Sequence, residues 1–167
     1  MKRYFNLAIA IAALTALPLK AFAHGSADHP KARKTSISKE EHAFGVEGDP
    51  KKASRTIALS MDDTMHYSQS QIRVAQGETV TFVVTNKGKL MHELVIGTEE
   101  ELKKHAELMR KNPGMEHDEP YMAHVKPGGK ERITWRFTKP GTFMYACLVA
   151  GHFEAGMDGT IVVAATN

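Results

Sequence analysis

Apolar residues alternate with polar or small residues through most of the chain that follows Arg55. Val80, Phe82 and Val84, for example, are separated by Thr81 and Val83. A period of two, rich in β-branched and aromatic residues, is typical of strands that bury one face. The pattern predicts an all-β fold, an antiparallel β-sandwich of about seven strands. The predicted strands lie near residues 57–61, 72–74, 79–85, 90–96, 133–138, 143–147 and 161–163.

One segment breaks the alternation. Thr98 can cap a helix whose first turn carries glutamates at 99, 100 and 101, and Lys111 lies near its end. Asn112-Pro113-Gly114 then stops the helix. The sequence therefore predicts one helical insertion in the sandwich, between Gly97 and roughly Lys126.

The first 23 residues have the pattern of a secretory signal peptide. Lys2 and Arg3 precede an apolar run over residues 7–17, and Ala21-Phe22-Ala23 offers small residues where a signal peptidase reads. The alternative is a retained membrane anchor, but the run is too short to span a bilayer comfortably. Cleavage after Ala23 predicts export, with no membrane span afterwards.

Removal of this leader changes the charge balance. It takes away Lys2, Arg3 and Lys20, so that 19 basic residues remain against 19 acidic ones. A formally neutral chain gives no reason to expect a nucleic-acid partner. Residues 24–53 are polar and charged, which predicts a flexible N-terminal arm. Residues 54–167 are then one domain, large enough for a core of its own.

The chain has a single cysteine, Cys147. Exported proteins usually pair their cysteines in disulfides, which a lone cysteine cannot do within its own chain. It is a buried bystander, an intermolecular link, a reactive thiol or a metal ligand. His152 and Met157 follow at intervals of five residues, with Gly151 and Gly156 able to tighten the loop that carries them.

A fourth residue completes a set of metal-binding types. His92 shares one face of a predicted strand with Leu94 and Ile96, so it points into the apolar layer. A histidine in that position is more often a hydrogen-bonded core residue than a ligand. One thiolate, two imidazoles and a weak thioether are, however, the ligands of a blue-copper site. Together the four residues predict such a site: His92, Cys147, His152 and Met157.

Longer stretches around these residues resemble the cupredoxins, the small blue-copper proteins. The stretches are "LMHELVIG" and "FMYACLVAGHFEAGMDGTIVV", and "RVAQGETVTFVVTN" and "GHFEAGM" are similar to exported bacterial cupredoxins of the copper-tolerance type. The resemblance covers about Thr56 to Ala164. It implies a Greek-key β-sandwich, one type 1 copper that cycles between Cu(I) and Cu(II), a periplasmic location and a monomer. The implied partner is a redox protein or a copper donor or acceptor protein.

The sequence departs from relatives of this kind at three positions. Glu93 follows the upstream histidine where many blue-copper proteins have Asn. Ala150 and Gln69 stand where Pro is common, and Ala150 makes the ligand loop less rigid. These departures leave the four expected ligands in place.

The predicted insertion holds further candidate ligands. His105 and Met109 are four residues apart and share a helix face. Soft thioethers and imidazoles suit copper, so a second, exchangeable copper site is one interpretation, and simple packing of the helix on the sandwich is the other. The candidates for the second site are His105, Met109, Met115, His117 and Met122. His24, as the N-terminus after cleavage, could chelate Cu(II) through its amine and ring, and His29, His42 and His66 could assist, although a solvated tail is the simpler interpretation.

These observations predict a copper protein of electron transfer, of copper tolerance, or of both. The alternative is copper sequestration or relay, with the second site and little electron transfer. An enzyme is not expected, because Ala146 and Leu148 flank Cys147 where multicopper oxidases and copper nitrite reductases need histidines. A cysteine hydrolase is also not expected, because no helix begins at Cys147 to lower the pKa of its thiol.

Overall fold

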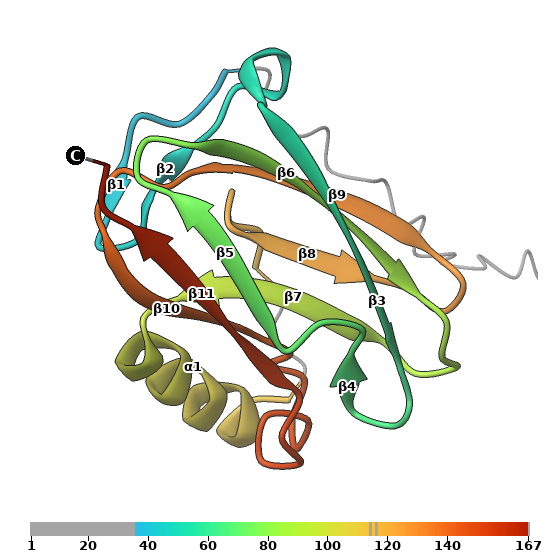
Figure 1. Ribbon diagram of the computed structural model, residues 1–167. Helices are drawn as coiled ribbons and strands as arrows, with labels where there is room; N and C mark the ends of the chain where they lie inside the picture. The colour runs from blue at the N-terminus through green and yellow to red at the C-terminus, as the bar shows by residue number, and fades with distance from the viewer. Residues whose placement is uncertain (1–35, 114, 116, 167) are drawn as a thin grey trace, which may run out of the picture. The chain divides into compact units, whose positions relative to one another are not determined.

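The alternating segments form two β-sheets in the computed structural model, which describes residues 36–113, 115 and 117–166 (Figure 1). The predicted signal peptide and the residues up to 35 lie outside these ranges. One sheet has the order β1 (Glu41–His42), β2 (Gly45–Glu47), β9 (Lys130–Arg136), β6 (Thr79–Asn86), β3 (Arg55–Asp62) and β4 (His66–Tyr67). The other has the order β5 (Gln71–Ala75), β11 (Asp158–Ala164), β10 (Gly141–Ala146), β7 (His92–Gly97) and β8 (Met122–Val125).

The predicted β-sandwich is confirmed, and its details differ from the expectation. The seven predicted strands are present as β3, β5, β6, β7, β9, β10 and β11, and the described residues add the short strands β1, β2, β4 and β8. Two pairings, β3 with β6 and β5 with β11, are parallel, so the expectation of a purely antiparallel sandwich is wrong. An alternating pattern says which face of a strand is buried and nothing about its direction.

The strand that carries His92 is buried along its whole length, because both of its faces are covered. Leu94 and Ile96 of β7 point into the core between the sheets, where Trp135 and Phe82 also lie. Val95 points to the other face, under the helix α1 (Glu99–Lys111). Figure 1 shows this helix beside β7 and β10. The arrangement leaves His92 on the side of the core and Glu93 on the side of the helix.

The helix itself agrees with the prediction. The Thr98 side chain accepts a hydrogen bond from the Glu101 N–H, while the Glu101 carboxylate accepts one from the Thr98 N–H, which forms a capping box. Leu102, Ala106 and Met109 form its buried face. The predicted insertion is not wholly helical, however, because β8 lies within it and pairs with β7.

The prediction of a flexible N-terminal arm is wrong for the described part of that segment. The predicted flexible segment over residues 24–53 contains, in its described part, β1, β2 and a 3-10 helix at Pro50–Lys52. Phe44 is 2% exposed and stacks on Trp135 with ring centroids 5.1 Å apart. The Trp135 Nε1 donates a hydrogen bond to the carbonyl of Phe44 over 3.0 Å. One aromatic residue therefore anchors an otherwise polar segment by closing the core over Trp135.

Among the described residues, no helix is long and apolar enough to cross a membrane.

The anchoring role of Phe44 can be tested by truncation. Phe44→Ala removes the ring that covers Trp135, and we expect the free energy of unfolding to fall by about 3 kcal/mol. Ile37→Ala is the control, since Ile37 is 43% exposed in the same N-terminal region, and it should change stability by less than about 0.5 kcal/mol. Denaturant unfolding of both variants measures the difference. Equal, small effects would show that the segment is not part of the core.

Candidate metal centre

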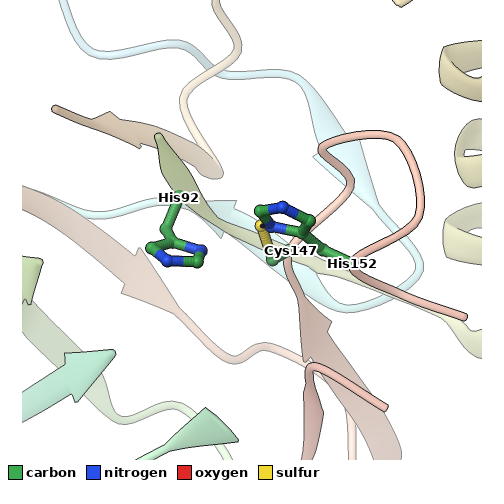
Figure 2. A group of neighbouring side chains, drawn as sticks. All are labelled: His92, Cys147 and His152. Atoms are coloured by element: carbon green, nitrogen blue, oxygen red, sulfur yellow. Dashed lines mark hydrogen bonds between the residues drawn. The ribbon is translucent and has the colours of Figure 1, made fainter. Parts of the chain in front are cut away.

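Three side chains from two distant parts of the chain meet inside the sandwich (Figure 2). They are His92, Cys147 and His152, and their ligand atoms all lie within 4.8 Å of one another. His92 and Cys147 are 0% exposed and His152 is 8% exposed. The structure therefore brings together three of the four residues that the sequence predicted as copper ligands, in a buried site.

The pairing of two strands delivers the first two residues. β7 and β10 are antiparallel neighbours, with Tyr145 opposite Ile96 and Ala146 opposite Val95. Cys147 follows the end of β10 and so lies beside the start of β7. The N–H of Glu93 donates a hydrogen bond to the Cys147 Sγ over 3.3 Å, which ties the two strand ends together at the sulfur.

The loop between β10 and β11 delivers His152. The Cys147 N–H donates to the Met157 carbonyl over 3.0 Å, and the Met157 N–H donates to the His152 carbonyl over 3.0 Å. Gly151 and Gly156 both have φ of 88°, a region that glycine adopts without strain. The two glycines thus allow the tight turns that bring His152 back over Cys147.

The imidazole of His152 faces the sulfur directly. Its Nδ1 lies 3.2 Å from the Cys147 Sγ. Burial is the main cause that lowers the pKa of His152, so that its ring is neutral at neutral pH and can offer a lone pair. Burial also raises the pKa of the Cys147 thiol to about 12, so that without a cation the thiol keeps its proton.

The second imidazole is oriented by a carboxylate that the sequence reasoning missed. The Asp63 Oδ1 lies 3.0 Å from the His92 Nε2 and also accepts a hydrogen bond from the Leu90 N–H. The Asp63 Oδ2 accepts one from the Lys89 N–H. These backbone donors, that of Lys89 first, lower the pKa of Asp63, so the carboxylate is ionised and holds the proton of His92 on Nε2.

Asp63 leaves the other ring nitrogen of His92 free. The Nδ1 of His92 is buried and has no hydrogen-bond partner among the described residues. A buried nitrogen without a partner is costly unless something else binds it. One soft thiol sulfur and two imidazole nitrogens are the donors that copper takes, so the residues present fit a copper ion.

Met157 lies at the end of the same loop. It is fully buried, in the core cluster that contains Cys147, and its backbone makes the two loop hydrogen bonds described above. Its place is compatible with the predicted axial ligand, and that role stays a prediction.

Glu93, the departure noted in the sequence, has a partner on the neighbouring strand. Its Oε1 lies 2.9 Å from the Nδ1 of His124 on β8. This hydrogen bond is the main cause that raises the pKa of His124 to about 9, so His124 is protonated at neutral pH and its charge offsets that of the buried carboxylate. Nothing in the sequence beyond its residue type pointed to His124.

The residues predicted for a second copper site separate into two groups. The Nε2 atoms of His105 and His117 lie 2.8 Å apart. Met109 and Met122 are instead buried between the helix and the sheet, and Met115 packs against the same cluster. The interpretation of simple packing therefore holds for these methionines, while the two histidines form a pair that packing does not explain.

The other histidines lie elsewhere. His24 and His29 are outside the described residues. The ring of His42 packs against those of Phe44, Tyr121 and Trp135, and the Nδ1 of His66 lies 2.6 Å from the Thr64 carbonyl. Neither is part of the three-residue group around Cys147.

Comparison with known proteins agrees with this geometry. The family model described as "copper binding proteins, plastocyanin/azurin family" matches residues 54–164. The chain belongs to this family. Copper is therefore the cofactor of this cupredoxin, as the sequence predicted.

Two curated relatives are copper-resistance proteins. The chain is 48% identical over 120 residues to the copper-resistant cuproprotein CopI of Rubrivivax gelatinosus, covering 72% of this chain and 73% of the relative. It is 33% identical over 161 residues to the copper-resistant cuproprotein CopI of Vibrio cholerae, covering 90% of this chain and 95% of the relative. A solved structure, the reduced auracyanin of Roseiflexus castenholzii, superposes with a TM-score of 0.59 at 29% identity, covering 67% of this chain and 98% of that one. These likenesses confirm the cupredoxin fold.

Proposed function

We propose that this cupredoxin holds one type 1 copper through His92, Cys147, His152 and Met157, and that it serves copper tolerance in the periplasm by a one-electron cycle at this centre. The unpartnered Nδ1 of His92 carries the proposal, because it is buried beside the Cys147 Sγ and the His152 Nδ1. Bound copper supplies a change between Cu(I) and Cu(II). The protein's own groups set the conditions for that change.

Each group has a separate task. Asp63 keeps the proton of His92 on Nε2, which leaves Nδ1 as the donor. The N–H of Glu93 donates to the Cys147 Sγ and stabilises negative charge on a thiolate. All four predicted ligand side chains are buried, so the site has little water to rearrange when an electron arrives. Met157 completes the set as the weak axial donor.

The proposed role and location are drawn from the relatives and from the N-terminal sequence. The names of the two CopI relatives favour copper tolerance, and the pattern over residues 1–23 favours export. A redox protein or a copper donor or acceptor protein of the periplasm would be the partner of a monomer. The protein has no catalytic turnover in this proposal, since buried Ala146 and Leu148 flank Cys147 and give it no histidine link to a further copper centre.

The thiolate ligand has a direct optical test. Cu(II) added to the purified protein should give an intense visible band from charge transfer between the Cys147 sulfur and copper, because a thiolate bound to Cu(II) is the source of such a band. Cys147→Ala should abolish the band, while His66→Gln, a change at an exposed histidine outside the site, should keep it. A band that survives in Cys147→Ala would refute the site. The role predicts that wild type restores copper tolerance to a deletion strain and Cys147→Ala does not, so equal restoration by the two proteins would refute it.

The positioning role of Asp63 can be tested by substitution, with the adjacent Asp62 as the control. Asp63→Asn leaves one acceptor oxygen where the structure uses two, so the amide cannot hold both the loop and the His92 ring. We expect the copper affinity to fall by about 10- to 100-fold. Asp62→Asn is the control, because the Asp62 carboxylate accepts its hydrogen bonds from the N–H and hydroxyl of Thr64, and the copper affinity of this variant should be unchanged. Competition with a copper chelator measures both variants, and equal affinities would contradict the role of Asp63.

A further inference from the structure

A pair of histidines outside the type 1 site brings two ring nitrogens face to face. His105 lies on α1 and His117 on the segment that follows the helix, and both are half-buried. Their ring centroids are 4.6 Å apart with an angle of 41° between the planes, and their Nε2 atoms are 2.8 Å apart. A contact this short requires something between the two lone pairs, either one proton or one cation.

The spacing suits a cation. Two nitrogen ligands that lie about 2.0 Å from one ion and at right angles to each other are roughly 2.8 Å apart. Imidazole nitrogens at right angles are typical of tetragonal Cu(II), which also binds such sites more tightly than the other divalent first-row metals. We propose that His105 and His117 form a second metal site, which takes one Cu(II) by displacing the proton that the pair shares.

The structure holds both rings in place before any ion arrives. The buried face of α1, with Leu102, Ala106 and Met109, fixes the helix that carries His105. The His124 Nε2 donates a hydrogen bond to the carbonyl of His117 over 2.8 Å. His124 is itself held through its Nδ1 by the Glu93 carboxylate. The same residue, Glu93, therefore braces Cys147 through its N–H and the His117 segment through its side chain.

The second site is open, unlike the first. Among the described residues, no group of three His, Cys, Asp or Glu side chains includes His105 and His117. The protein thus supplies two ligands, and water or the donors of another protein fill the remaining positions. An ion held in this way exchanges readily, so the pair is a place where copper is taken up or passed on. The second site is separate from the proposed type 1 centre and shares no ligand with it.

Copper counting and electron paramagnetic resonance test the second site. After one equivalent has filled the type 1 centre of the purified protein, a second equivalent of Cu(II) should bind with a signal that carries no intense visible band. Pulsed measurements on the wild type should find two imidazoles on this second copper. His105→Gln and His117→Gln should each lose it and keep the visible band, and His66→Gln should keep both signals.

Each alternative result has a clear meaning. The site would be overturned if the wild type bound no second copper or if that copper had fewer than two imidazole ligands. It would also be overturned if His105→Gln and His117→Gln bound the second copper as well as the wild type does. The count of imidazoles needs no variant, so it decides the matter even where a glutamine variant fails to fold. Cys147→Ala separates the two proposals, because it should lose the visible band and still bind copper at the histidine pair.

Discussion

The Sγ of Cys147 lies out of contact with water, with the Nδ1 of His152 3.2 Å away and the N–H of Glu93 3.3 Å away. The sulfur can be there only because β7 and β10 pair in one register and the next loop turns sharply at Gly151 and Gly156. A slip of one residue in that pairing would move Cys147 to the other face of the sheet. The sandwich and the site therefore depend on the same strand contact.

The site keeps polar atoms in the core at a cost to stability. The Nδ1 of His92 and the Oε2 of Glu93 are both buried without a hydrogen-bond partner among the described residues. Folding alone would disfavour such groups, and proteins retain them mainly where they have a function. Asp63 and His124 limit the cost by binding the other polar atom of each side chain. The tautomer of His92 is thereby set before copper binds.

The sequence predicted the residues that are close along the chain or that stand out by type. The single cysteine, the two five-residue intervals after it and a histidine on an apolar strand face were enough to predict four ligands, of which the structure groups His92, Cys147 and His152. The alternation of apolar residues was enough to indicate seven strands. Asp63 could not be found in this way, because it lies in a turn just after β3 and 29 positions from His92. Phe44 was missed because a polar composition hides one residue that packs on a tryptophan 91 positions away. Both depend on contacts that no local pattern records.

The central claim is that one copper lies between the sulfur of Cys147 and the Nδ1 atoms of two histidines. A crystal structure of the copper-loaded protein, with anomalous data at the copper edge, tests it most directly. We expect one strong peak in the core, bonded to the Cys147 Sγ, the His92 Nδ1 and the His152 Nδ1, with the His92 Nε2 still on Asp63. A core without copper, or a His92 ring turned so that Nε2 binds the ion, would contradict the account.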